Sequence, residues 1–263
     1  MPIIDVHVHA FPDALAQRAM AALEGPIDWK AIGDGTVNGL LRSMDSAGVD
    51  ASVICNIATK PSQVEPIFKW CTQIASERII PFPSIHPETP DVAGWIRRFK
   101  DAGLRGIKLH PMYQEFAFDE LRMDRLYAAV AEAGLVLEPH CGYDIAFPGD
   151  KRADADRIAR VIDRHPTLKI ICTHLGAWRQ WEAAGRHLVG RGVWLETSMS
   201  VSLLGLKAAA DLIRAHGPSK VLFGTDWPWT SQTDQVNLLR LLDLPREQIE
   251  AVLGGNAARL LGL

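Results

Sequence analysis

The 263-residue sequence has no long hydrophobic run, no large excess of charge and no clustered cysteines, and each absence argues against a class of protein. No segment offers the roughly 18 uncharged apolar residues of a membrane-spanning helix, and the first residues do not read as a secretion signal. The formal net charge is -3, without a basic stripe or a charged tail that would suit nucleic acid. We therefore expect a cytoplasmic globular protein that binds neither membranes nor nucleic acid.

Cysteine is scarce and scattered. Cys55, Cys71, Cys141 and Cys172 form no C-x-x-C pair, which argues against a zinc knuckle and against a thioredoxin-type redox motif. We expect four reduced thiols. Cys55 and Cys172 lie in apolar, strand-like runs, so we interpret them as small core residues.

The sequence does contain a regular alternation of strand-like and helix-like segments. Short runs rich in β-branched residues are followed by amphipathic segments, and the pair recurs with a period of roughly 25 to 30 residues. The expected strands cover residues 3–9, 51–55, 79–87, 105–110, 135–140, 168–174, 192–197 and 220–226. The expected helices cover residues 36–47, 63–76, 91–102, 119–133, 155–164, 180–188, 203–215 and 234–242, with a terminal pair at 246–253 and 256–261.

This pattern predicts an α/β protein with a single (β/α)8 TIM-barrel domain over residues 1–263. The length suits either one barrel of about 250 residues or two small domains, and no linker or change of composition divides the chain. A doubly wound open sheet is the alternative, although its crevice would not draw polar residues from nearly every strand end. Residues 10–35 are expected to form an irregular loop, and because this loop carries Trp29 we interpret it as a lid.

Histidines are concentrated at the ends of the expected strands. Six of the nine histidines lie at or just after the C-terminal ends of these strands, namely His7, His9, His86, His110, His140 and His174. Asp226 lies at the end of the eighth expected strand. In a barrel these ends meet at one rim, where the active site lies. Imidazoles with a carboxylate and an open position for water are typical of catalytic rather than structural zinc sites. The other three histidines, His165, His187 and His216, lie in or after helices and are expected to be surface or capping residues.

The first expected strand carries His7 and His9. Residues i and i+2 of a strand share a face, so these two imidazoles, about 7 Å apart along the strand, can bind one metal ion. The alternative is that both are core histidines, in which case each buried polar ring needs a hydrogen-bond partner. Asp5 shares the same face, deeper in the barrel, and would either support a ligand or cap buried backbone groups.

Six stretches together resemble the amidohydrolase superfamily. They resemble its amidohydrolase-related branch, which includes aminocarboxymuconate-semialdehyde decarboxylase and pyrone-dicarboxylate lactonase. The resemblance covers essentially the whole chain. It rests on HVH at 7–9, GIKLHP at 106–111, HCG at 140–142, THLG at 173–176, FGTDWP at 223–228 and GNAARLL at 255–261.

The resemblance implies that His7, His9, His140 and Asp226 are metal ligands and that His174 is a catalytic histidine. It implies one divalent ion per chain, and the histidine-rich ligand set favours Zn²⁺, with Mn²⁺ or Fe²⁺ as alternatives. Such an ion lowers the pKa of its bound water to about 7. Asp226 can then accept a proton as a second catalytic residue, while His174 orients the water or polarises a substrate oxygen.

Lys108 and His110 share a face of the fourth expected strand and are candidates for contact with a metal or with the substrate. Relatives with two metals use a carboxylated lysine on this strand as a bridge. The alternative is a buried ion pair between Lys108 and Glu138, which also faces inward.

Residues in the expected rim loops are candidates for substrate binding. Their aromatic rings suit a small cyclic or conjugated compound, and Arg179, together with Lys30, is a candidate for binding a substrate carboxylate, the alternative being two solvated charges. The substrate-binding candidates are Trp29, Tyr113, Tyr143, Arg179 and Trp227.

We predict a metal-dependent hydrolase that uses an activated water on a C–O or C–N bond of a small cyclic or carboxylated organic substrate. The first alternative is a metal-dependent decarboxylase of an unsaturated or aromatic acid, which needs a cationic clamp that the sequence does not reveal as an arginine pair. The second alternative is a non-catalytic barrel that binds a small molecule. The sequence leaves open whether the chain forms a homo-oligomer.

Overall fold

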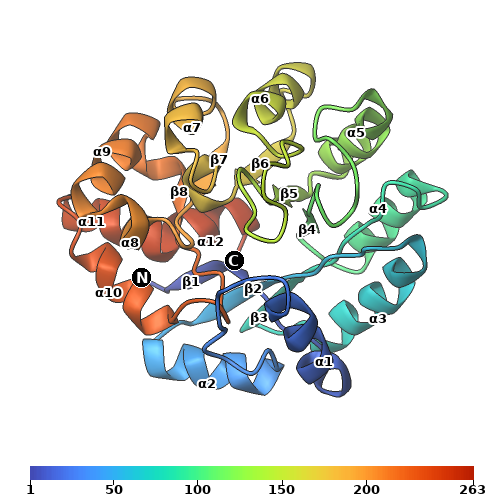
Figure 1. Cartoon of the computed structure of the whole chain (residues 1–263), viewed down its shortest axis with the longest axis horizontal. Coiled ribbons are helices and arrows are strands. Elements are labelled where there is room, and N and C mark those ends of the chain that lie inside the picture. The colour runs from blue at the N-terminus through green and yellow to red at the C-terminus, as the bar shows by residue number, and fades with distance from the viewer. The chain divides into compact units, whose positions relative to one another are not determined.

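The computed structural model describes residues 1–263, and the chain divides into two compact units. Unit 1 comprises residues 1–54, 77–79 and 196–263, and unit 2 comprises residues 55–76 and 80–195. Strands and helices alternate along the chain (Figure 1), as the sequence predicts.

Unit 1 holds the first and last segments of the chain. Its strands are β1 (Ile4–Val8), β2 (Ala51–Cys55, except its last residue) and β8 (Val221–Leu222). Its helices are α1 (Asp13–Glu24), α2 (Val37–Ala47), α8 (Val201–Leu204), α9 (Leu206–His216), α10 (Gln232–Arg240), α11 (Arg246–Glu250) and α12 (Asn256–Leu261), with a 3-10 turn at Pro218–Lys220 and a π-helical turn at Ala251–Gly255.

Unit 2 holds the central segments. Its strands are β3 (Ile79–Phe82, except its first residue), β4 (Gly106–Leu109), β5 (Val136–Pro139), β6 (Lys169–Cys172) and β7 (Trp194–Glu196, except its last residue). Its helices are α3 (Val64–Ile74), α4 (Val92–Asp101), α5 (Asp124–Ala133), α6 (Ala155–Arg164) and α7 (Trp181–His187), with 3-10 turns at Pro61–Gln63, Leu121–Met123 and His174–Gly176.

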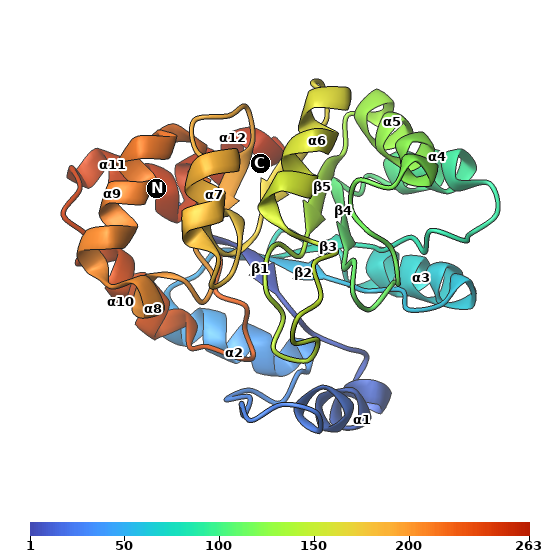
Figure 2. The same ribbon diagram turned by 45° about the horizontal axis from the view of Figure 1, so that its top comes forward.

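Residues 13–24 form helix α1, so the prediction of an irregular loop throughout residues 10–35 was wrong. This segment is rich in alanine, the strongest helix former, and Pro12 and Gly25 mark the ends of a helix. Helix α1 buries only Ala16 and Met20, and Figure 2 shows it at the lower edge of the view, beyond α2 of the same unit. A single expected helix at 203–215 is also divided into α8 and α9, because Gly205 has a φ of 80°.

Strand β1 has a neighbour on each side within unit 1. It pairs in parallel with β2, and its Val6 N–H donates to the Phe223 carbonyl 2.8 Å away. Val8 forms a parallel bridge to Trp227, after β8. All five residues of β1 are buried, as expected for a parallel strand covered on both faces. The two histidines of the H-x-H motif therefore lie in and just after a strand held from both sides.

In unit 2, strands β4, β5, β6 and β7 pair in parallel in that order. Ser84, just after β3, bridges in parallel to Lys108 of β4. Lys108 lies opposite Glu138 of β5 in the strand register. The C-terminal ends of these strands are thus brought side by side, and the histidines that follow them are brought into contact.

The predictions for cysteine and for the outlying histidines have mixed outcomes. All four cysteines are buried and free of disulfides, as expected. His165 is half-buried and lies 3.0 Å from Asp124, but His216, expected at the surface or in a cap, is buried at the end of α9.

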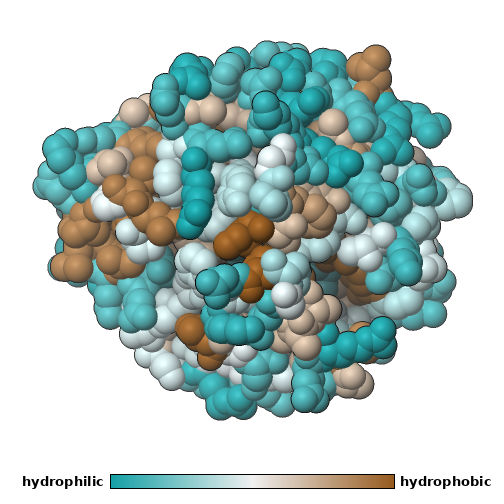
Figure 3. All heavy atoms as spheres, viewed as in Figure 1, coloured by the Kyte–Doolittle hydropathy of each residue, from teal (hydrophilic) through white to brown (hydrophobic).

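No helix has both the length and the apolar character needed to cross a membrane. Figure 3 shows apolar residues over α8 and α9, where Leu203 and Leu206 are exposed.

Candidate metal centre and active site

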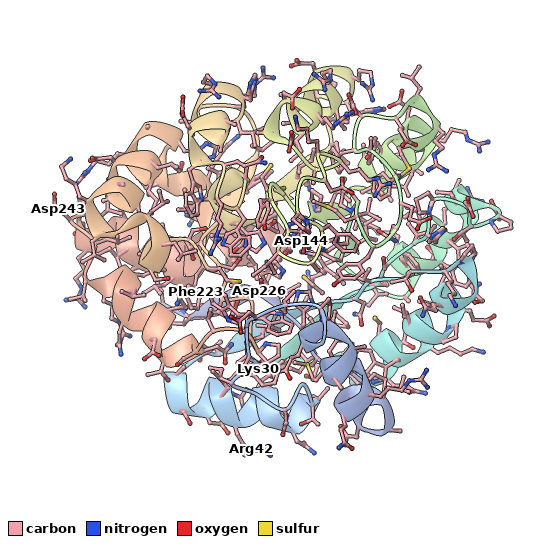
Figure 4. All side chains as sticks on the ribbon, viewed as in Figure 1. Lys30, Arg42, Asp144, Phe223, Asp226 and Asp243 are labelled. Carbon is pink, nitrogen blue, oxygen red and sulfur yellow. The ribbon has the colours of Figure 1, made fainter.

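Three of the predicted ligands converge within unit 1. The Nε2 atoms of His7 and His9 are 3.2 Å apart, and the Oδ1 atom of Asp226 lies 3.6 Å from the first and 3.1 Å from the second. His7 and Asp226 are buried, and His9 is half-buried. Figure 4 labels Asp226 in the segment after β8. The H-x-H motif and the aspartate, more than 200 residues later, thus point three ligand atoms at one position.

The backbone around these ligands explains their placement. The N–H of Asp226 donates to the His7 carbonyl (2.8 Å), and the N–H of His9 donates to the Trp227 carbonyl (2.6 Å), so the segment after β8 is bound to β1 on both sides of the aspartate. Asp226 itself has a φ of 63°, in the left-handed region that a non-glycine residue occupies at a cost of about 1–3 kcal/mol. Such conformations are concentrated at functional sites.

Glu196 contacts His7 through the ring nitrogen that does not face the other ligands. Its Oε1 lies 3.1 Å from His7 Nδ1, and Glu196 is fully buried at the end of β7. A carboxylate only accepts, so this contact is a hydrogen bond in the tautomer that carries its proton on Nδ1, which leaves the lone pair of Nε2 for a metal. Metal-binding histidines commonly donate their second ring N–H to a carboxylate in this way.

The ligand set fits a divalent metal ion. Bonds of about 2.0–2.1 Å in a tetrahedral arrangement separate neighbouring ligand atoms by about 3.3 Å. The three separations of 3.1, 3.2 and 3.6 Å lie close to that value. Two carboxylates, Asp226 and Glu196, accompany the two imidazoles, so the charge of the cluster also favours a divalent cation.

Asp5 caps buried backbone groups, which is the second of its two predicted roles. Its carboxylate accepts from the His7 N–H (3.2 Å), from the Thr225 N–H and hydroxyl (3.0 and 2.6 Å) and from the Gln232 side-chain amide (2.8 Å). Burial raises the pKa of Asp5 to about 7, against the effect of these donors. Asp5 therefore connects β1 to the segment that carries Asp226.

His140, expected from the resemblance to be a fourth metal ligand, belongs to unit 2. Its Nε2 lies 3.2 Å from the Tyr143 carbonyl and its Nδ1 lies 3.3 Å from Nε2 of His174, the expected catalytic histidine. Burial, with a further contribution from the neighbouring His110, lowers the pKa of His140 well below 6.5. His174 has a φ of 60°, so it shares the strained backbone seen at Asp226.

His110 packs against the same group of residues in unit 2. Its ring stacks on His140 with centroids 4.5 Å apart, and its Nε2 lies 3.1 Å from Oδ2 of Asp144, which Figure 4 labels in the loop after β5. Burial would raise the pKa of Asp144, but the hydrogen bond from His110 and the nearby His140 hold it well below its usual value. His110, His140 and Asp144 are a second group with metal-ligand chemistry in the chain.

Lys108 forms the ion pair that the sequence offered as the alternative to a metal bridge. Its Nζ lies 3.5 Å from Oε1 of Glu138, and both side chains are buried. The Cys55 thiol donates to the same carboxylate oxygen at 3.4 Å. A carboxylated lysine would place a second negative group beside Glu138, so this pairing favours a cationic Lys108.

Three of the predicted substrate residues occupy unit 2. Tyr113 packs edge-on against His110 with centroids 4.6 Å apart, and burial, followed by the charge of Asp144, raises the pKa of Tyr113 to about 12. Tyr143 stacks on Trp178 at 5.9 Å, and the exposed Arg179 places its guanidinium 4.7 Å from the Trp178 ring. Arg179 is thus held by an indole face rather than by an acidic residue.

The other two predicted substrate residues belong to unit 1. Trp227 is buried, and a side chain at Gly33 would meet its indole at 2.5 Å, so the 25–36 loop passes directly over it. Trp29 is half-buried and donates from Nε1 to the Trp229 carbonyl at 3.3 Å. Lys30, labelled in Figure 4, is exposed and lies 3.7 Å from Glu24. The loop after α1 therefore covers the segment that follows Asp226.

Sequence reasoning missed Glu196, Ser198 and Asp144. Glu196 is the penultimate residue of the expected strand 192–197, so the criterion that selected the histidines could have found it. Asp144 follows His140 by four residues in a loop. Ser198 carries no signal in the sequence, because its role depends on the carboxylate two residues before it.

Parallel strands that alternate with helices, with histidines and an aspartate at the strand ends, define an α/β protein that carries groups of possible metal ligands. The model of the amidohydrolase family matches residues 4–263, so the chain belongs to that family and is an enzyme of the amidohydrolase superfamily, as its motifs predicted. Comparison with curated proteins finds no match.

Solved structures with low sequence identity share the fold. They include an uncharacterised TIM-barrel protein from Bordetella bronchiseptica (20% identity, TM-score 0.75) and 5-carboxyvanillate decarboxylase LigW from Sphingomonas paucimobilis (18%, 0.73). A third is 5-carboxyvanillate decarboxylase from Novosphingobium aromaticivorans, complexed with manganese and 4-hydroxy-3-methoxy-5-nitrobenzoic acid (15%, 0.77). Each similarity covers 100% of this chain, and 99%, 99% and 96% of the respective structures. The predicted TIM-barrel fold is confirmed.

Proposed function

We propose that this chain is a metal-dependent decarboxylase of a small aromatic or unsaturated acid. The observation that carries the metal-dependent part is the convergence of His7, His9 and Asp226 on one position, with Glu196 behind His7. The reaction type is supported by the two structurally similar decarboxylases, one of them with manganese bound. The family match over residues 4–263 supports our further proposal that the chain is one catalytic domain.

A divalent ion at this position would polarise a substrate oxygen and lower the pKa of a bound water. The side chains of this protein have the remaining tasks. His7, His9 and Asp226 would hold the ion, and Asp226 could also carry a proton. When the bond to the carboxylate breaks, its electron pair stays on carbon, and a proton must be delivered there. The assignment of His140 as a further ligand and of His174 as a catalytic histidine rests on the family resemblance.

Hydrolysis of a C–O or C–N bond is the second candidate. It is favoured by the placement of the two predicted carboxylate-binding cations, since Arg179 stacks on Trp178 and Lys30 lies beside Glu24 at the surface. Both Arg179 and Lys30 are exposed, so neither forms the buried cationic clamp for a substrate carboxylate that a decarboxylase needs. The same metal ligands serve both reactions, so the choice between them needs a measurement of product.

The metal site is tested by elemental analysis of the purified protein. We expect about one divalent ion per chain, with zinc, manganese and iron all measured, and loss of the ion in His7→Ala and Asp226→Ala. His187→Ala, which removes a histidine from the end of α7, is the matched control and should keep the wild-type content. Equal metal content in wild type and His7→Ala would refute the site. A metal content that falls in His140→Ala would support its assignment as a ligand.

The reaction type is tested with metal-loaded protein and a panel of hydroxybenzoates, lactones and amides. Carbon dioxide release that is lost in Asp226→Asn and in His174→Ala supports the decarboxylase. Hydrolysis without carbon dioxide release would overturn it in favour of the second candidate. Tight binding of a panel compound without turnover would favour the non-catalytic barrel.

A further inference from the structure

The carboxylate of Glu196 lies within hydrogen-bond distance of both His7 and Ser198 in unit 1. Its Oε1 accepts from the Ser198 hydroxyl at 2.6 Å and lies 3.1 Å from His7 Nδ1, while its Oε2 accepts from the Ser198 N–H at 2.6 Å. The Ser198 hydroxyl is also 3.3 Å from His7 Nδ1. Both carboxylate oxygens therefore serve as acceptors, and each faces a different donor.

The surrounding backbone holds this carboxylate in one place. A Cβ at Gly224 would lie 2.1 Å from Glu196 Oε2 and 3.2 Å from the Cβ of His7, so only glycine leaves room for the carboxylate. The Thr197 hydroxyl donates to the Gly224 carbonyl and accepts from the Gly224 N–H, at 3.2 Å each. These bonds fix the residue after Glu196 against the segment after β8.

We propose that Glu196, supported by Ser198, is a positioning residue that sets the tautomer and orientation of His7 and thereby the metal affinity of the centre. This inference rests on the proposed metal site. With its proton on Nδ1, the His7 ring presents the lone pair of Nε2 towards His9 and Asp226. The negative charge of Glu196 also strengthens the ring as a ligand.

These contacts predict that a glutamine at position 196 does not replace the carboxylate of Glu196. In Glu196→Gln one oxygen becomes an NH2 group. If the NH2 group occupied the Oε2 position, it would meet the Ser198 N–H, and two donors would face each other. If it occupied the Oε1 position, it would meet His7 Nδ1, which must then accept, so the proton moves to Nε2 and the lone pair is lost to the metal.

The test measures metal affinity and the His7 tautomer as separate quantities. Dissociation constants for zinc and manganese are obtained by competition with a chelator, and we expect Glu196→Gln to weaken binding by about 10–100-fold. Ser198→Ala keeps the backbone donor and should weaken binding less. Glu250→Gln, at a half-buried acid of the same unit that pairs with Arg246, should match wild type. Ring ¹⁵N spectra of chelator-treated protein should show His7 protonated at Nδ1 in wild type and at Nε2 in Glu196→Gln.

Several outcomes would overturn the inference. Unchanged metal affinity in Glu196→Gln would do so, even if that variant unfolds at a lower temperature, because the contact would then be structural only. If the variant does not fold, the wild-type spectrum decides, since a His7 protonated at Nε2 contradicts the proposal. Wild-type protein that binds no metal refutes the proposed function, whereas metal binding with an unaltered Glu196→Gln constant refutes only this inference.

Discussion

At the scale of single residues, the two predicted catalytic side chains carry strained backbone. Asp226 and His174 have φ values of 63° and 60°, although neither is glycine. The left-handed region costs such residues about 1–3 kcal/mol, and the cost persists only where surrounding contacts enforce it. At Asp226 these contacts include the hydrogen bond from its N–H to the His7 carbonyl. This hydrogen bond therefore helps to keep Asp226 in the conformation that directs its carboxylate towards His7 and His9.

Gly224 offers a residue-scale prediction. Its substitution by alanine places a methyl group 2.1 Å from Glu196 Oε2, so the carboxylate must move from its position beside His7. We expect Gly224→Ala to lower the free energy of unfolding by about 1–3 kcal/mol through overpacking and to weaken metal binding as Glu196→Gln does. Urea unfolding in chelator and metal titration measure the two effects.

The matched control is Gly185→Ala in helix α7, where an added Cβ meets no atom within 4 Å. We expect this control to keep the wild-type metal affinity and to be as stable or slightly more stable, because alanine is the better helix former. Wild-type metal affinity in Gly224→Ala would show that the carboxylate can shift without loss, contrary to the prediction.

At the scale of elements, charged side chains fasten helix α6 to the segment before α5. Asp119 accepts hydrogen bonds from Arg157 and Arg160, both on α6. Partial burial would raise the pKa of Asp119, but the bonds from Arg157 and Arg160 outweigh this and hold it below 3.8. The negative charge of this aspartate therefore contributes to the stability of the unit.

Asp119→Asn should make this contribution visible as a pH dependence. Because the pKa is lower in the folded state, the stabilisation is present above about pH 4 and is lost as the pH falls through the folded-state pKa. We expect the variant to be about 1 kcal/mol less stable than wild type at pH 7, with a difference that shrinks below pH 4. Unfolding by urea at several pH values measures this.

Asp156→Asn is the control, since Asp156 pairs with the same Arg160 at 2.9 Å but has a side chain that is 44% exposed, against 16% for Asp119. Its loss should change stability by no more than about 0.5 kcal/mol. A difference between wild type and Asp119→Asn that stays constant down to pH 2 would contradict the electrostatic explanation.

At the scale of the whole molecule, a metal ion that binds only the folded chain must stabilise it. An ion concentration about 100 times the dissociation constant adds about 2.7 kcal/mol, which corresponds to a rise of several degrees in the unfolding temperature of a chain of this size. We expect a chelator to remove this rise in wild type. His9→Ala should unfold at the same temperature with and without chelator, as calorimetry can show. An identical response of wild type and His9→Ala would contradict metal binding at this site.

Much of the element order could be predicted because it depends on local patterns. Strand β2 and helices α6 and α12 have the expected bounds, and the other expected strands were too long by a few residues at their ends. Helix α1 was not predicted, because Pro12 and Pro26 on either side of it suggest a loop, although its own residues favour a helix. The division of the expected helix 203–215 at Gly205 was not predicted, because the φ of a single glycine does not follow from its sequence.

The sequence by itself determined the chemistry that is available: histidines and an aspartate at strand ends, the β-branched strands that carry them, and the family motifs. Periodicity and residue type are local properties, so they can be read without a structure. Only the tertiary structure brought the Glu196 carboxylate to Nδ1 of His7, because Glu196 lies 189 residues away and its approach depends on the glycine at 224. It likewise decided that Lys108 pairs with Glu138, since strand register brings together side chains 30 residues apart.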